Sequence, residues 1–177
     1  MMINLRLAAL GLCTVCASTT VCFAQTPQQA AATFFNPQGQ EIGRATLTQT
    51  ASGVLIDIDV SNISEGEHGF HIHETGACDA ADAFKSAGGH FEPAQHQHGY
   101  MAEHGPHAGD MPNQFIGRDG TLRAHVLNPN ITLSDGPESL FDADGSAIVV
   151  HAGPDDYHSQ PAGNAGDRIA CAVIEWR

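Results

Sequence analysis

The sequence predicts an all-β protein with seven or eight strands packed as two sheets. Short strand-like runs recur along most of the chain, and turn residues separate them. No convincing amphipathic helix pattern accompanies these runs. The 177 residues contain 42% hydrophobic side chains, which suffices for the core of one domain. No internal repeat or second domain is visible, so the strands are expected to share this core.

The first half of the chain supplies three strand signals. Residues 32–49 read as two strands around an Asn-Pro-Gln-Gly turn. Residues 54–60, VLIDIDV, alternate between two faces, and this period of two is typical of a strand with one buried face. The face expected to be buried carries Val54, Ile56, Ile58 and Val60. Residues 69–73, GFHIH, form a short extended run.

The second half supplies the remaining strands. Residues 115–127, FIGRDGTLRAHVL, predict a β-hairpin with Asp119 and Gly120 at its turn. Residues 147–151, AIVVH, and 168–176, RIACAVIEW, are continuous apolar runs suited to strands of a sandwich or barrel.

Two segments lack the strand pattern and are predicted to be functional loops. Residues 74–113 are rich in Gly, His, Pro and Ala, and residues 152–167 in Gly, Pro and Asp. Loops of this length are uncommon in compact domains unless they carry function or are disordered. Five of the eleven histidines fall in the longer loop and none precedes residue 68, so a metal ion is expected to order it.

The amino terminus has the pattern of a secretory signal. Arg6 precedes an apolar run from residue 7 to 23, and Ala24 comes before a polar stretch. We expect cleavage after Ala24, a domain spanning residues 25–177, and a soluble periplasmic protein that does not span the membrane. Three of five cysteines leave with the signal. The remaining Cys78 and Cys171 are then expected to form one disulfide in an oxidising compartment.

Acidic side chains outnumber basic ones. Seven Lys plus Arg oppose twenty Asp plus Glu, for a formal charge of −13. Loss of Arg6 would leave six basic side chains and a charge of −14. Such a surface repels nucleic acid and anionic lipid, so neither is expected as a partner.

The histidines predict a metal site. His71 and His73 are two residues apart on a strand, so both imidazoles point to the same face. The longer loop offers His90, His98, His107 and Asp110; three imidazoles and one carboxylate suit tetrahedral zinc. His96 and His104 lie close by, so spacing alone does not select the ligands.

Six motifs give the chain a specific resemblance. GEHGFHIHE, SAGGHFEP, HG, GPHAGDMPN, VVHAGPDD and GNAGDRIACAVI occur in the order found in copper-zinc superoxide dismutases, from about residue 30 to 174. The sequence resembles the bacterial exported branch of that family. The resemblance implies a Greek-key β-sandwich or flattened barrel of about eight antiparallel strands, with two long functional loops. It also implies one copper and one zinc per subunit, and the dismutation of superoxide anion to dioxygen and hydrogen peroxide.

The same resemblance assigns roles to individual positions. Copper would be bound by His71, His73, His90 and His151, and zinc by His90, His98, His107 and Asp110. His90 would be shared by the two metals and take part in catalysis with Arg168, which would dock the anion beside copper. Asp155 would link His71 to His98, His68 would serve structural hydrogen bonding, and Cys78 would be bonded to Cys171.

Two other functions compete with dismutation. A cupin-type metal barrel also uses His-x-His on a strand, but it would need a glutamate at a wider spacing than Glu74. A periplasmic copper or zinc buffer would have the same scaffold without turnover.

Two positions depart from the family pattern: Glu92 replaces a common Asn and Ala162 a frequent Thr. A homodimer is compatible with the sequence, which assigns no role to His96, His104, His125 or His158.

Overall fold

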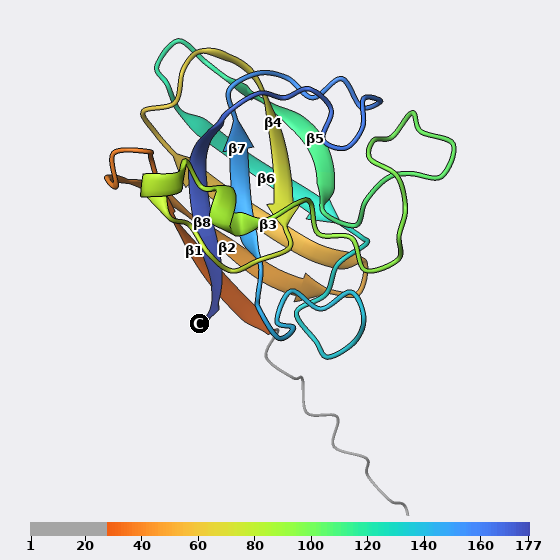
Figure 1. The fold of residues 1–177 in the computed structure, drawn as a ribbon. Helices are drawn as coiled ribbons and strands as arrows, with labels where there is room; N and C mark the ends of the chain where they lie inside the picture. Colours follow the sequence, from red (N-terminus) through yellow and green to blue (C-terminus); the bar gives the residue numbers. More distant parts are fainter. Residues whose placement is uncertain (1–27) are drawn as a thin grey trace, which may run out of the picture.

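The computed structural model describes residues 28–177 and consists of eight antiparallel strands (Figure 1). The strands are β1 (Gln29–Phe35), β2 (Glu41–Thr50), β3 (Gly53–Val60), β4 (Gly66–His73), β5 (Asp110–Ile116), β6 (Leu122–Asn128), β7 (Ala147–His151) and β8 (Arg168–Trp176). They form one sheet in the order β5-β4-β7-β8-β1-β2-β3-β6. The sheet curves into a nearly closed barrel, so the all-β prediction is confirmed.

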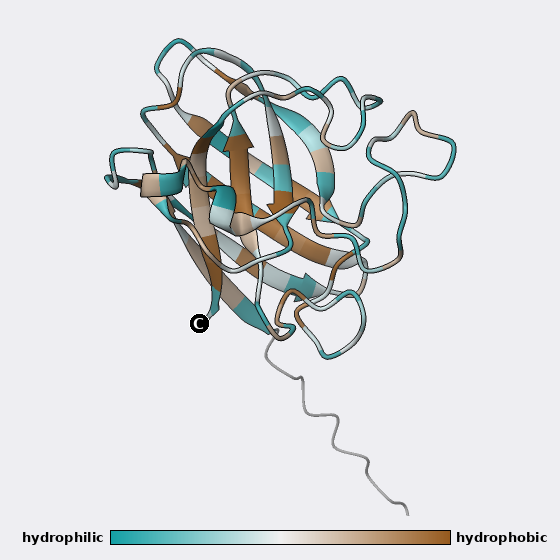
Figure 2. Ribbon diagram, viewed as in Figure 1, coloured by the Kyte–Doolittle hydropathy of each residue, from teal (hydrophilic) through white to brown (hydrophobic). Residues whose placement is uncertain are grey.

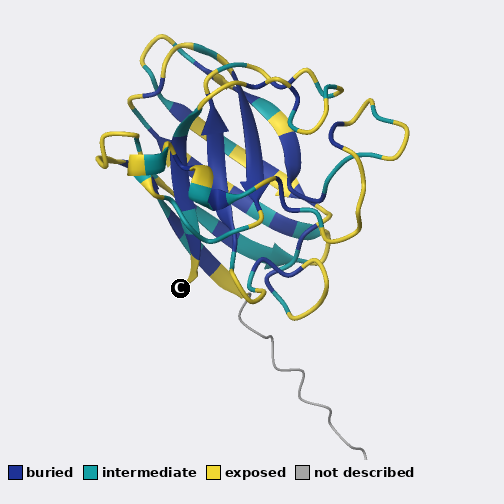
Figure 3. Ribbon diagram, viewed as in Figure 1, coloured by how far each residue is buried: buried dark blue, intermediate teal, exposed yellow. Residues whose placement is uncertain are grey.

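The alternating pattern of the sequence places the core inside this barrel. Val54, Ile56, Ile58 and Val60 are all buried, as predicted, whereas Asp57 and Asp59 between them are exposed. The core residues come from all eight strands, and both the hydrophobic residues and the buried residues are concentrated on the strands (Figures 2 and 3). Strands such as β3 expose their other face, whereas β7 is buried at every residue and β4 from His68 to His73, so other parts of the chain cover the outer face of these two strands.

The predicted hairpin over residues 115–127 is wrong. A turn does lie at Asp119 and Gly120, where the Gly120 N–H donates to the Gly117 carbonyl. However, β5 pairs with β4 and β6 pairs with β3, so the two strands lie at opposite ends of the sheet order. Each strand satisfies its hydrogen bonds with a different neighbour, and the turn crosses the gap where the barrel nearly closes.

The two long loops lie over the outer face near the ends of β4, β7 and β8 (Figure 1). The longer one is shorter than predicted, because residues 110–113 belong to β5. It contains two short 3₁₀ helices, η1 (Ala80–Asp82) and η2 (Lys85–Ala87). The second loop, residues 152–167, connects β7 to β8 as predicted.

The proposed signal at residues 1–24 lies outside the described residues. Within residues 28–177, no helix has both the length and the apolar character needed to cross a membrane.

Candidate metal centre

Strand β4 divides its side chains between the core and the site. Phe70 and Ile72 pack in the core cluster, while His71 and His73 point to the opposite, outer face. The covering loops bury both imidazoles, which are at most 1% exposed. The period of two that predicted a shared face for these histidines is therefore confirmed.

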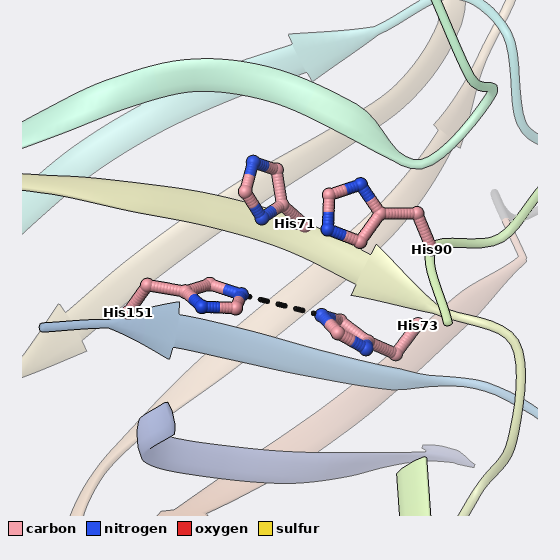
Figure 4. Close-up of side chains that lie close together, drawn as sticks. All are labelled: His71, His73, His90 and His151. Carbon is pink, nitrogen blue, oxygen red and sulfur yellow. Dashed lines mark hydrogen bonds between the residues drawn. The ribbon is translucent and has the colours of Figure 1, made fainter. Parts of the chain in front are cut away.

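Four imidazoles gather on this outer face (Figure 4). His71 and His73 come from β4, His151 from the end of β7, and His90 from the longer loop, which forms an isolated bridge with His73. One ring nitrogen of each lies within 4.8 Å of the other three. The Nε2 atoms of His73 and His151 are 3.4 Å apart. This arrangement unites the four residues predicted to bind copper.

A second cluster adjoins the first and is centred on Asp110, the first residue of β5. Its Oδ1 atom lies 2.7 Å from His90 Nδ1, 3.1 Å from His98 Nδ1 and 3.5 Å from His107 Nδ1. The other oxygen, Oδ2, accepts hydrogen bonds from the N–H groups of Gly99 and His107. Three imidazole nitrogens and one oriented carboxylate oxygen thus converge, in the set predicted for zinc.

His90 belongs to both clusters. Its Nδ1 faces Asp110, whereas its Nε2 is buried and has no hydrogen-bond partner among the described residues. The remaining ring nitrogen of His71, Nδ1, and the Nδ1 atom of His107 are likewise buried without partners. Unpaired buried polar atoms are costly, and a cation in each cluster would satisfy them. The donor sets therefore fit copper in the first cluster and zinc in the second.

Burial and neighbouring groups lower the pKa values of three of the imidazoles in the first cluster. Burial lowers the pKa of His90 to about 4 although Asp110 opposes the shift, and burial and neighbouring His71 lower the pKa of His151 to about 3. Burial also lowers the pKa of His73. Such rings are neutral at physiological pH, the state in which an imidazole binds a metal.

His98 is shifted in the opposite direction because two carboxylates surround it. Burial alone would lower its pKa, but hydrogen bonds to Asp110 and Asp155 raise it to about 9. The pKa of each carboxyl group is held well below its usual range; burial opposes this shift and the hydrogen bonds from the histidines outweigh it.

Asp155 lies behind the metal clusters and connects them. Its Oδ2 is 2.8 Å from His71 Nε2 and its Oδ1 is 3.0 Å from His98 Nε2. These contacts leave the Nδ1 atom of each ring directed toward a cluster. A carboxylate in this position fixes the tautomer and orientation of a metal-binding imidazole.

Two further residues, neither of them marked by a sequence signal, set the position of Asp155. Asn113 donates from Nδ2 to the Asp155 carbonyl and accepts from the Asp155 N–H. Gly163, at a φ of +66°, lies so close that a Cβ atom there would collide with the Asp155 carboxylate and the His98 ring.

Arg168, the first residue of β8, is held by the longer loop. Its Nη1 and Nη2 each donate a 2.6 Å hydrogen bond, to the carbonyls of Phe84 and Gly88 respectively. The segment carrying these carbonyls is fixed by the predicted Cys78–Cys171 disulfide and by buried Phe84, which packs with Val149 and Cys171. Burial lowers the pKa of Arg168, but a guanidinium remains charged at physiological pH.

Other candidate residues lie outside the two clusters. His68 is buried, and its ring nitrogens lie 2.6 Å from the His151 carbonyl and 3.0 Å from the Ser64 carbonyl. These contacts agree with a structural role in hydrogen bonding. Glu74 accepts from the Gly89 N–H, and Glu92 accepts from the N–H groups of Ala94 and Ala108. Neither metal cluster contains any of the unassigned histidines: His96, His104, His125 and His158.

Comparisons with known proteins agree with this geometry. The model of the copper/zinc superoxide dismutase family matches residues 41–174. The chain is 54% identical over 142 residues to a copper-zinc superoxide dismutase of Aquifex aeolicus, covering 79% of this chain and 83% of that relative. A superoxide dismutase of Caulobacter vibrioides is 42% identical over 140 residues, covering 77% of this chain and 80% of the relative.

Solved structures share the fold. The crystal structure of a superoxide dismutase-like protein from Bacillus subtilis superimposes with a TM-score of 0.78 at 36% identity, covering 81% of this chain and 96% of that one. The copper/zinc superoxide dismutase of Brucella abortus gives 0.67 at 27% identity, covering 84% of this chain and all of the other.

Proposed function

The chain belongs to the copper/zinc superoxide dismutase family, and from this premise we propose how its own residues serve the reaction. It is a superoxide dismutase with a copper site and a zinc site that share His90. The observation that carries the proposal is the position of His90, whose two ring nitrogens face different clusters. Copper supplies one-electron oxidation and reduction of superoxide, and zinc supplies a fixed positive charge.

The position of His90 allows it to donate a proton as well as to bind a metal. Its Nε2 is buried, has no hydrogen-bond partner within residues 28–177 and faces the cluster where the substrate is expected. Two superoxide anions and two protons give dioxygen and hydrogen peroxide, so the superoxide that is reduced takes up two protons, one from solvent and one that a side chain can supply. We propose that His90 holds a proton at Nε2 and donates it to the product, while its Nδ1 remains in the zinc cluster.

Arg168 is proposed to dock the substrate. A guanidinium has five N–H donors, and two of them are used by the carbonyls of Phe84 and Gly88. The others have no hydrogen-bond partner among the described residues and could receive a small anion. A local positive charge can attract superoxide despite the overall charge of −13, because potential near the site governs steering more than net charge does.

Metal analysis combined with kinetics tests this function. Purified protein is expected to contain one copper and one zinc per chain and to remove superoxide rapidly in a pulse-radiolysis or stopped-flow assay. Removal of copper should abolish turnover, and copper should restore it. Full loading with both metals but no dismutation would instead support the metal-buffer hypothesis.

We also propose that the protein is exported to the periplasm with cleavage after Ala24. The support is the signal pattern of residues 1–24 and the Cys78–Cys171 disulfide, a bond favoured outside the reducing cytosol. Mass spectrometry of protein from the periplasmic fraction should give a chain that begins at Gln25. Full-length chain confined to the cytoplasm would contradict this proposal.

A homodimer through the outer face of β5 is our proposal for the subunit arrangement. β5 is at one end of the sheet order, and Phe115 on it is 74% exposed. Copies with this net charge repel, so contact is favoured at an uncharged apolar side chain. Sedimentation should report a dimer that Phe115→Glu converts to monomer, while the control Trp176→Glu, on β8, leaves it dimeric. A parent that sediments as a monomer would exclude the proposal.

A further inference from the structure

The loop segment that holds Arg168, residues 79–88, contains an unexplained carboxylate. Asp82 accepts a hydrogen bond from the Ser86 N–H at Oδ2, 2.9 Å away. Its other oxygen, Oδ1, is buried and has no hydrogen-bond partner among the described residues. A carboxylate oxygen that is desolvated and unpaired is costly, so its position suggests a function beyond packing.

Asp82 lies within the structure that positions the guanidinium. Its Oδ2 bond fixes Ser86, which stands between Phe84 and Gly88, the residues whose carbonyls bind Arg168. Phe84 has a φ of +62°, and this left-handed backbone is held from both sides: its N–H donates to the Asp79 carbonyl, and its carbonyl accepts from Ala87. The Asp82 carboxylate is therefore part of the loop structure that positions Arg168.

The charge of Asp82 also acts on Arg168. Burial lowers the pKa of Arg168, and the negative charge of Asp82 opposes that shift. Arg168 nevertheless gives both of its observed hydrogen bonds to carbonyl groups, so its other N–H groups are not consumed by Asp82. The other charged groups of the segment are exposed: Asp79, whose side chain caps η1, and Lys85.

We propose that Asp82 is a positioning residue that keeps the guanidinium of Arg168 in place and weakens its attraction for anions. A docking group that binds anions too tightly would let anions other than superoxide occupy the site. A nearby negative charge reduces the positive potential at Arg168 without occupying its donors. The inference rests on the proposed docking role of Arg168.

Asp82→Asn separates charge from structure, because the Asn Oδ1 atom can still accept from the Ser86 N–H. Asp135→Asn is the matched control: it changes net charge equally, at an exposed carboxylate with no described hydrogen bond or ion pair. Asp82→Glu retains the charge. Azide, a small monovalent anion, is titrated into zinc-loaded, copper-free protein while the Arg168 Nε–H resonance is followed by NMR. The half-saturating azide concentration should fall roughly twofold in Asp82→Asn alone at low ionic strength.

The kinetic result should parallel the binding result. Copper- and zinc-loaded Asp82→Asn should react roughly twofold faster with superoxide at low ionic strength, and the gain should vanish near 1 M salt, where the screening length is about 3 Å. Azide binding equal to that of Asp135→Asn would overturn the proposal, as would a variant slower at every ionic strength. If Arg168→Ala is as fast as the parent, the docking role itself fails; if it is slow while Asp82→Asn and Asp135→Asn behave alike, only the role of Asp82 fails.

Discussion

The Nδ1 atom of His90 lies 2.7 Å from Oδ1 of Asp110, while Nε2 of the same ring faces the other histidine cluster and has no hydrogen-bond partner in the described part of the chain. The His90 side chain is 2% exposed and its Nε2 is buried, so solvent does not replace the missing contact. One imidazole therefore couples the two sites physically: moving it changes the donor set of both.

His90→Ala should weaken both metal sites. The substitution removes one donor from each cluster, so the loss of zinc affinity should exceed the roughly 10- to 100-fold typical of losing an outer partner. Metal content after dialysis and competition with a chromophoric chelator measure the effect. His96→Ala, a change in the same loop outside both clusters, should leave copper and zinc bound. Retention of both metals by His90→Ala would refute the shared-ligand assignment.

Asp155→Asn should lower zinc affinity roughly 10- to 100-fold without unfolding the protein. The amide group cannot accept from His71 Nε2 and His98 Nε2 together, so one ring must turn or change tautomer. The neighbouring Asp156→Asn is the control, because Asp156 is exposed and caps the backbone of His158 and Ser159. Equal zinc dissociation constants for the two variants would show that the Asp155 bridge does not orient the ligands.

Sequence periodicity predicted the parts of the fold that depend on local pattern. The buried face of residues 54–60 and the shared face of His71 and His73 follow from the two-residue period of a strand. The 115–127 hairpin failed because a turn signal gives local chain reversal and carries no information about which strand becomes the partner.

The side chains that form the metal clusters could be predicted from the sequence. The backbone groups that hold other site residues in place could not. Resemblance to a family supplied the ligand sets, which spacing alone left open between His98 and its neighbours. The carbonyls of Phe84 and Gly88 that hold Arg168 could not be predicted, since every residue has a carbonyl and its direction depends on the loop backbone. Asn113 is similar: its bonds to Asp155 span 42 residues.

Zinc binding to metal-free protein should release at least one proton at pH 7.5. Although burial lowers the pKa of His98, its hydrogen bonds to Asp110 and Asp155 raise it to about 9, so the ring is protonated at that pH. Zinc must displace the proton at Nδ1. Apparent affinity should therefore rise with pH until about 9. Calorimetry in buffers of different ionisation enthalpy measures the release; heats independent of buffer at pH 7.5 would contradict a charged His98.

Replacing Cys78 and Cys171 together by serine should lower the free energy of unfolding by about 2–5 kcal/mol in metal-free protein. The bond joins residues 93 positions apart, so its loss frees a long loop in the unfolded chain. It also releases the segment that carries Phe84. Urea denaturation with and without a reductant provides the measurement; a reductant should destabilise the parent and leave the double variant unchanged.

Arg168→Ala should slow dismutation several-fold or more while both metals remain bound. The substitution removes the donors proposed to receive superoxide, but it leaves every residue of the two metal clusters in place. Arg44→Ala is the matched control, since it removes the same charge from an exposed pair with Glu41 on β2. The defect of Arg168→Ala should diminish as salt increases, because screening weakens electrostatic steering in the parent as well. A variant as fast as the parent at low ionic strength would rule out this role for the guanidinium.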